Sequence, residues 1–93
     1  MAKVYIENKG VEVLVDMQTD ITTASAITLE VTRPSGKVFT WRPTIYNTTF
    51  FRYITKEDDL DESGTYKIQP HFTLGNWTGW GETVSMIIYA KGA

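Results

Sequence analysis

The chain has 93 residues and a formal net charge of −2, and 42% of its residues are hydrophobic. This length suits one domain, and the hydrophobic fraction is too high for a disordered chain. The lysines and arginines are scattered rather than gathered in a basic stripe, which argues against binding to a nucleic-acid backbone. Cysteine is absent, so disulfides, thiol nucleophiles and thiolate metal sites are excluded.

Alternating apolar and polar residues predict about seven short strands. In chain order they cover residues 4–6, 11–15, 27–31, 38–44, 50–55, 66–72 and 83–89. The polar, threonine-rich residues 16–25 are interpreted as a loop or a crossing segment. No helical period occurs, and strand-favouring valine, isoleucine, threonine and aromatic residues are abundant. We therefore expect one all-β domain over residues 1–93.

Turn-forming residues separate these strands. Residues 33–37 read Arg-Pro-Ser-Gly-Lys and predict a hairpin turn. Pro43 has no backbone N–H to donate, so its strand ends there or lies at a sheet edge. Residues 74–81 contain three glycines and two tryptophans and are predicted to form a glycine-rich turn.

Residues 59–68 carry the most specific signal for the fold. An acidic turn leads to Gly64, and Tyr66 follows two residues later at the start of an alternating segment. This is the layout of a tyrosine corner, in which the phenol bonds the backbone of the preceding turn at the edge of an immunoglobulin-like sandwich. Glu62, rather than Asp61, stands four residues before the tyrosine.

The spacing of three apolar residues agrees with that fold. Immunoglobulin-like domains place one core residue on strand B, a tryptophan on strand C, and another core residue two places after the corner tyrosine. Leu29, Trp41 and Ile68 can fill these places, with apolar residues replacing the disulfide. The sequence thus predicts an immunoglobulin-like antiparallel β-sandwich.

The chain offers little for catalysis. His71 is the only histidine, and no nucleophile or carboxylate accompanies it in a recognisable motif. It alternates with apolar neighbours, so we expect it on the exposed, polar side of its strand. We predict neither an enzyme nor a cofactor.

Five carboxylates gather within six residues of the predicted corner: Glu57, Asp58, Asp59, Asp61 and Glu62. Oxygen-rich loops suit Ca²⁺, but the spacing does not match an EF-hand, and sandwich corners are often acidic because they are exposed. A solvated turn is the preferred interpretation, and a Ca²⁺ site is the alternative.

Two other features suit contact with a partner. Trp77 and Trp80 flank Thr78-Gly79, where they either anchor a protein interface, stack on sugars, or fold back as a lid over the sandwich. The short strand that contains Val4 and Ile6 could add to the sheet of a neighbouring protein.

Most of the chain resembles small immunoglobulin-like structural proteins of tailed bacteriophages. The resemblance rests on "DLDESGTYKIQPHF" and "GNWTGWGETVSMIIY", and it extends to "MAKVYIENKGVEVLVDM" and "ITLEVTRPSGKVFTW". These proteins are similar to the N-terminal domain of phage baseplate upper proteins. The specific pattern is Trp-x-Gly-x-Gly-Glu-Thr before the last strand, and this chain departs from it by placing Trp80 inside the turn.

The resemblance implies a non-enzymatic virion component: a capsid decoration or a head–tail or baseplate accessory protein. Such a protein folds in the bacterial cytoplasm and then binds other virion proteins in many copies, with no role for nucleic acid or membrane. The longest apolar run, residues 86–90, is too short to span a bilayer. The alternative function is a glycan-binding module in which Trp77, Trp80 and Tyr46 form a stacking platform.

Overall fold

The computed structural model describes residues 4–92, which form nine β-strands and no helix. The strands are β1 (Val4–Tyr5), β2 (Glu12–Asp16), β3 (Ser25–Thr32), β4 (Val38–Trp41), β5 (Thr44–Tyr46), β6 (Phe50–Ile54), β7 (Gly64–Leu74), β8 (Trp77–Trp80) and β9 (Val84–Tyr89). The prediction of an all-β fold is confirmed. The predicted number of about seven was too low, because β5 and β8 were not recognised as separate strands.

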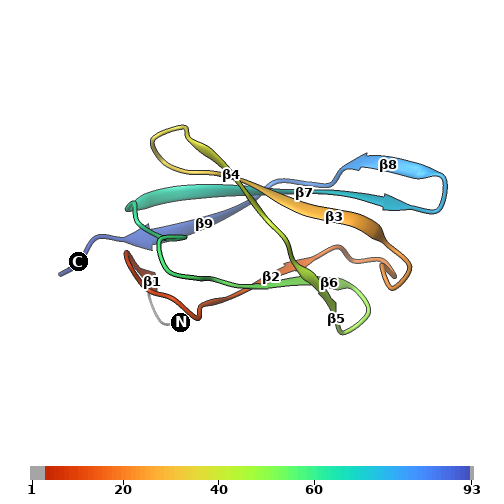
Figure 1. Cartoon of the computed structure of the whole chain (residues 1–93), viewed down its shortest axis with the longest axis horizontal. Helices are drawn as coiled ribbons and strands as arrows, with labels where there is room; N and C mark the ends of the chain where they lie inside the picture. The colour runs from red at the N-terminus through yellow and green to blue at the C-terminus, as the bar shows by residue number, and fades with distance from the viewer. Residues whose placement is uncertain (1–3, 93) are drawn as a thin grey trace.

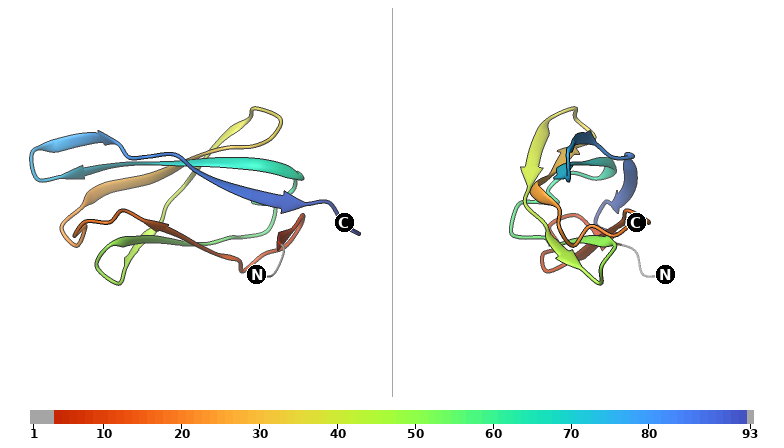
Figure 2. Two further views of the ribbon diagram at one scale, coloured as in Figure 1. Left: turned by 180° about the vertical axis from the view of Figure 1, so that it is seen from behind. Right: turned by 90° about the vertical axis from the view of Figure 1, so that its right-hand side faces the viewer.

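The strands form two sheets that face each other as a sandwich (Figures 1 and 2). The larger sheet has the order β1-β9-β7-β3-β4, with β8 paired to β7, and the smaller sheet has the order β2-β6-β5. All pairs are antiparallel except β1 with β9, which is parallel. The polar segment between β2 and β3 crosses from one sheet to the other. Of the two interpretations that the sequence left open, a loop or a crossing segment, the second is therefore correct.

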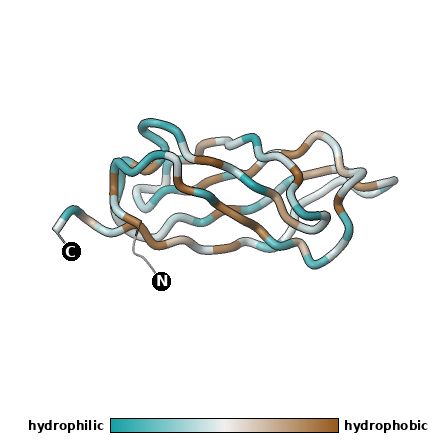
Figure 3. Tube along the Cα trace, turned by 90° about the horizontal axis from the view of Figure 1, so that it is seen from below, coloured by the Kyte–Doolittle hydropathy of each residue, from teal (hydrophilic) through white to brown (hydrophobic). Residues whose placement is uncertain are grey.

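The core lies between the sheets and follows the period of two that strands impose. Figure 3 shows hydrophobic and hydrophilic residues interspersed along the chain. On β7 the inward positions were predicted correctly, since Tyr66, Ile68, Pro70 and Phe72 are all buried. The crossing segment also contributes, because Ile21 is fully buried despite its polar neighbours. The buried side chains form one cluster that both sheets and the connecting loops supply.

The tyrosine corner is present. The hydroxyl of buried Tyr66 donates to the carbonyl oxygen of Glu62 at 2.9 Å and accepts from the Glu62 N–H at 3.0 Å. Gly64 has a φ of +126°, and a Cβ added there would lie 2.9 Å from side-chain atoms of Pro34. The glycine before the tyrosine is therefore required both by its backbone conformation and by close packing.

The core-spacing prediction was right about burial and wrong about placement. Leu29, Trp41 and Ile68 are all buried. However, Leu29 and Trp41 pair with each other on neighbouring strands of one sheet, whereas strands B and C of an immunoglobulin domain lie in opposite sheets. The turn at residues 33–37 keeps β3 and β4 together. The immunoglobulin-like type of the sandwich stays a prediction.

With β3 and β4 as strands B and C, the chain would have to cross to the other sheet between these two strands. It crosses between β4 and β5 instead. β4 ends at Trp41 in the larger sheet, and β5 begins at Thr44 in the smaller one, so Pro43 marks the end of a strand as predicted. Trp41 still bridges the two layers. Its ring stacks on Tyr53 of β6, with 4.6 Å between the ring centroids and 12° between their planes.

Candidate functional site

The segment predicted as a glycine-rich turn is the hairpin of β7 and β8, so that prediction was wrong. Leu74 pairs with Trp77 across a turn of only Gly75 and Asn76, and Gly75 takes a φ of +62°. A hydrogen bond of 2.9 Å between the hydroxyls of Thr73 and Thr78 supports the pairing. The hairpin lies at one end of the long axis, away from both termini (Figures 1 and 2).

Both tryptophans of β8 are half exposed. Trp77 retains 47% of its accessible surface and Trp80 retains 49%. The ring of Trp77 packs on buried Phe72 with 5.0 Å between centroids, while that of Trp80 meets His71 at 4.6 Å. Trp77 therefore covers part of the core edge, but neither ring is a buried lid.

The two tryptophans point to opposite faces of the hairpin. Residues three apart on a strand alternate in direction, and Phe72 and His71, their respective contacts, are adjacent residues of β7. Tyr46 is 44% exposed, but its ring contacts, with Phe50 and Arg52, both lie within the β5–β6 hairpin. The structure thus does not bring the three aromatic residues together as the flat platform that a glycan site would use.

His71 is more buried than predicted. It lies on the outward side of β7, as expected from its alternation with Pro70 and Phe72, but Trp80 covers it and leaves it half-buried. The ring contact is edge-on, with an interplanar angle of 68°. Its environment is that of a packing residue on the hairpin.

Val4 and Ile6 lie at the sheet edge that the sequence predicted, but their side chains already pack against the core of the protein. β1 is the last strand of the larger sheet and pairs with the end of β9, and the Ile6 N–H donates to the Tyr89 carbonyl oxygen at 3.0 Å. Both side chains are half-buried against the core. Any partner at this edge would meet the backbone rather than these side chains.

The acidic turn is not simply solvated, and this corrects the preferred interpretation. Arg33, only 7% exposed, pairs with the carboxylate of Asp61 and donates to the Asp58 carbonyl oxygen at 2.9 Å. Its guanidinium also lies 3.7 Å from the centre of the Phe39 ring. The turn is therefore bound to the β3–β4 hairpin by an arginine that the sequence analysis did not single out.

Two further carboxylates of the turn have structural partners. Asp59 accepts hydrogen bonds from the Tyr53 hydroxyl at 2.6 Å and the Lys56 N–H at 2.7 Å. Glu62 accepts from the N–H and the hydroxyl of Ser35, each at 3.0 Å. Within residues 4–92 no three acidic or histidine side chains are grouped so as to hold a metal ion, so the geometry does not support a Ca²⁺ site.

Burial changes the chemistry of two tyrosines near this turn. Burial raises the pKa of Tyr66 above its ordinary value, although the hydrogen bond to Glu62 and the charge of Arg33 oppose the change. Burial, and then the hydrogen bond and negative charge of Asp59, raise the pKa of Tyr53. Both hydroxyls stay protonated well beyond neutral pH, which suits hydrogen-bond donors in a fold and not general bases.

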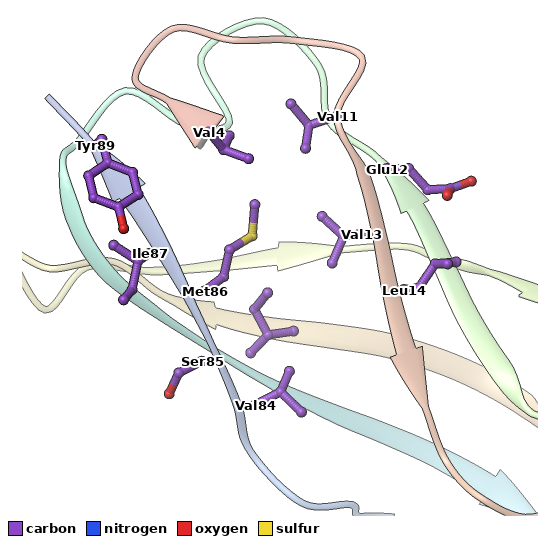
Figure 4. Close-up of a pocket in the computed structure, with 11 residues that line it drawn as sticks. Val4, Val11, Glu12, Val13, Leu14, Val84, Ser85, Met86, Ile87 and Tyr89 are labelled. Carbon is purple, nitrogen blue, oxygen red and sulfur yellow. The ribbon is translucent and has the colours of Figure 1, made fainter. Parts of the chain in front are cut away.

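A groove lies elsewhere, between β2 of the smaller sheet and β9 of the larger one (Figure 4). This groove has a volume of about 660 Å³. The side chains of Val13, Val84 and Met86 point into it (Figure 4). Ile68 of β7 also lines it. Strand alternation in the sequence indicated these inward positions, but it gave no sign that the two strand edges stand apart.

Comparison with known proteins gives no relative. The chain matches no protein-family model, and no curated protein or solved structure is similar to it. In the described part of the chain, no helix has the length and apolar character needed to cross a membrane.

Proposed function

We propose that this protein is a non-enzymatic structural domain of a bacteriophage particle that binds other virion proteins. The observation that supports it best is the β7–β8 hairpin, which carries Trp77 and Trp80 at 47% and 49% exposure. Half-exposed tryptophans contribute strongly to protein interfaces, where they bury a large apolar area. The assignment to a phage rests on the sequence resemblance, and the hairpin supports the binding role.

The orientation of the tryptophans restricts how a partner binds. Because the two rings lie on opposite faces of β8, a flat surface could engage only one of them. A partner that uses both must clasp the hairpin or offer a cleft that the hairpin enters. The same geometry disfavours the glycan-binding alternative, since sugar rings stack on aromatic side chains that share one face.

Attachment in many copies would strengthen such a contact. A single hairpin presents a small interface, and interfaces of that size bind weakly on their own. When copies occupy neighbouring positions on one particle, the second and later contacts form at a high effective concentration. A decoration or accessory protein of a capsid, tail or baseplate meets this condition.

The test is binding of the purified protein to particles assembled without it. Replacement of Trp80 by Ala should lower particle binding by about tenfold or more, because interface tryptophans rank among the residues that cost most when truncated. Tyr46→Ala is the matched control, since Tyr46 is similarly exposed at 44% but lies on the other sheet. Cosedimentation with the particles measures the effect.

Two results would refute the proposal. One is that the parent protein does not bind the particles at any concentration tested. The other is that Trp77→Ala and Trp80→Ala both bind as the parent does, which would remove the hairpin from the contact.

A further inference from the structure

Three cationic side chains that are separate in the sequence come together on the smaller sheet. They line one pocket of about 190 Å³ at the end of β6, whose lining residues are Arg42, Thr44, Arg52, Tyr53, Ile54 and Lys56. The sequence analysis found the lysines and arginines scattered, but the fold gathers three of the nine at this one place. In a chain whose formal net charge is −2, the pocket is a local reversal of charge.

Strand pairing explains why these residues meet. Thr44 of β5 pairs directly with Arg52 of β6, so their side chains lie on the same face of the sheet. This is the outer face, because Phe51, the preceding residue of β6, is fully buried in the core. β5 and β6 are antiparallel, so Arg42, two residues before Thr44, lies toward the end of β6 that leads to Lys56.

Most of this positive charge is not compensated within the protein. Arg42 and Lys56 are exposed, and in the described part of the chain neither side chain forms an ion pair or a hydrogen bond. Arg52 donates to Glu12 through Nε at 2.7 Å, and its guanidinium lies 5.4 Å from the centre of the Tyr46 ring. Its two terminal nitrogens donate to no acceptor among residues 4–92. Three cations and one carboxylate therefore leave two positive charges unmatched.

The acidic turn that follows Lys56 does not neutralise the pocket. Glu57 and Asp58 line a separate, mainly acidic concavity. Asp59 accepts from the Tyr53 hydroxyl and the Lys56 N–H, and its side chain is not among those that line the basic pocket. Lys56 and Glu57 are neighbours in sequence but belong to concavities of opposite charge.

A compact oxyanion with two negative charges matches this arrangement. The free edge of a guanidinium binds two oxygens of a phosphate or sulfate group, and a lysine ammonium binds another as a point charge. The Thr44 hydroxyl is a further donor, because its bond to the Arg52 carbonyl oxygen is long, at 3.5 Å. A single carboxylate has one charge and would leave one of the two unmatched cations without a partner.

We propose that Arg42, Arg52 and Lys56 form a binding site for a doubly charged tetrahedral oxyanion, phosphate or sulfate, either free or as a monoester. Both arginines bind its oxygens through their guanidinium edges, and Lys56 binds through its ammonium group. Glu12 holds Arg52 through Nε and leaves the edge of the two terminal nitrogens available. The site goes beyond the proposed function and does not depend on the tryptophan hairpin.

The test is a titration of the protein with sodium phosphate, followed by NMR of the backbone amides. At about pH 8 phosphate is mostly doubly charged, and sodium chloride keeps the ionic strength constant. We expect saturable shifts at residues 42, 44, 52 and 56, and binding of sodium acetate about tenfold weaker or less. A second titration with glycerol phosphate distinguishes the two sources: equal or tighter binding shows that the site takes a monoester, and weaker binding restricts it to the free ion.

Four variants assign the binding to the pocket. Arg42→Gln and Lys56→Gln should each weaken phosphate binding by about tenfold, because each removes a charge-assisted hydrogen bond. Lys67→Gln removes the same charge from an exposed position of the larger sheet and should bind as the parent does. Glu12→Gln removes the opposing charge and should strengthen binding by about threefold, a gain that partial unfolding cannot produce.

Three outcomes would overturn the inference. One is that phosphate gives no saturable shifts, or binds no better than acetate. Another is that Arg42→Gln and Lys56→Gln weaken binding no more than Lys67→Gln does. The third is that a single-stranded oligonucleotide binds at the pocket while inorganic phosphate does not. Trp80→Ala should leave phosphate binding unchanged, so this site and the hairpin contact are tested separately.

Discussion

At the scale of single residues, Tyr66 joins the acidic turn to the core through two hydrogen bonds. Its ring is fully buried, and its hydroxyl both donates to and accepts from the backbone of Glu62. Replacement by Phe keeps the ring and removes the hydroxyl, which leaves two backbone groups of the turn without their partner. We expect Tyr66→Phe to lower the free energy of unfolding by about 1–3 kcal/mol, measured by urea denaturation.

Tyr46→Phe is the control for that experiment. Tyr46 is exposed on β5, so removal of its hydroxyl should change stability by less than about 0.5 kcal/mol. If the two variants lose equal stability, the corner bonds contribute nothing beyond a surface hydroxyl, and the structural role given to Tyr66 is wrong.

Tyr66 and Arg33 differ in how far the sequence reveals their roles. Tyr66 belongs to a local pattern, since the turn, Gly64 and the tyrosine are adjacent in sequence and bond within four residues. Arg33 binds Asp61 from 28 residues away, and its neighbours indicate only a turn. Alternation of apolar and polar residues predicts one strand at a time. An ion pair between two loops that are far apart in sequence can therefore be recognised only from the three-dimensional fold.

At the scale of elements, the β5–β6 hairpin has a strained turn. Asn47 and Thr48 have φ values of 50° and 72°, and a left-handed backbone is unfavourable for a β-branched residue. The Thr48 carbonyl oxygen accepts from the Ile21 N–H at 2.9 Å, and any residue at this position keeps that bond. The turn thus keeps its conformation for reasons other than the threonine side chain.

We expect Thr48→Gly to raise the free energy of unfolding by about 0.5–1 kcal/mol. Glycine relieves a left-handed strain of about 1–2 kcal/mol and gives back part of it as backbone entropy. Thr49→Gly is the control, because Thr49 does not have a positive φ and glycine there should only destabilise. Thermal unfolding of both variants measures the difference, and a lower melting temperature for Thr48→Gly would contradict the prediction.

Elements differ in how well the sequence reveals them. Five-residue alternation located β2 and β6 within a residue or two, because each has one face in the core. β8 was missed because its four residues, Trp-Thr-Gly-Trp, do not alternate between apolar and polar side chains, and because the glycine between the tryptophans indicates a turn. The half-exposed tryptophans of the hairpin, the surface proposed for binding virion proteins, lie where the core imposes no pattern on the sequence.

At the scale of the whole molecule, the β7–β8 hairpin and the groove between β2 and β9 lie in different places on the sandwich. The hairpin lies at the end remote from the termini, and the groove runs along the side where β2 and β9 face each other (Figures 1 and 4). The buried cluster between the sheets connects to both, because Phe72 supports Trp77, and Ile68 lines the groove. Global stability therefore has to be followed in every binding experiment.

That global stability should fall at alkaline pH. Burial raises the pKa of Tyr53 and of Tyr66 in the folded state, whereas in the unfolded chain both titrate near pH 10. Above about pH 10 the unfolded state binds fewer protons than the folded state, so the free energy of unfolding decreases as pH rises. The stabilisation is fully present below that pH and is lost progressively above it.

Urea denaturation at intervals between about pH 8 and pH 11 measures this decrease. Tyr53→Phe removes one of the two groups and should make the decrease shallower, even though it lowers stability at neutral pH by losing the bond to Asp59. Stability that stays constant across this range, or a slope that Tyr53→Phe leaves unchanged, would show that folding does not raise the pKa of Tyr53.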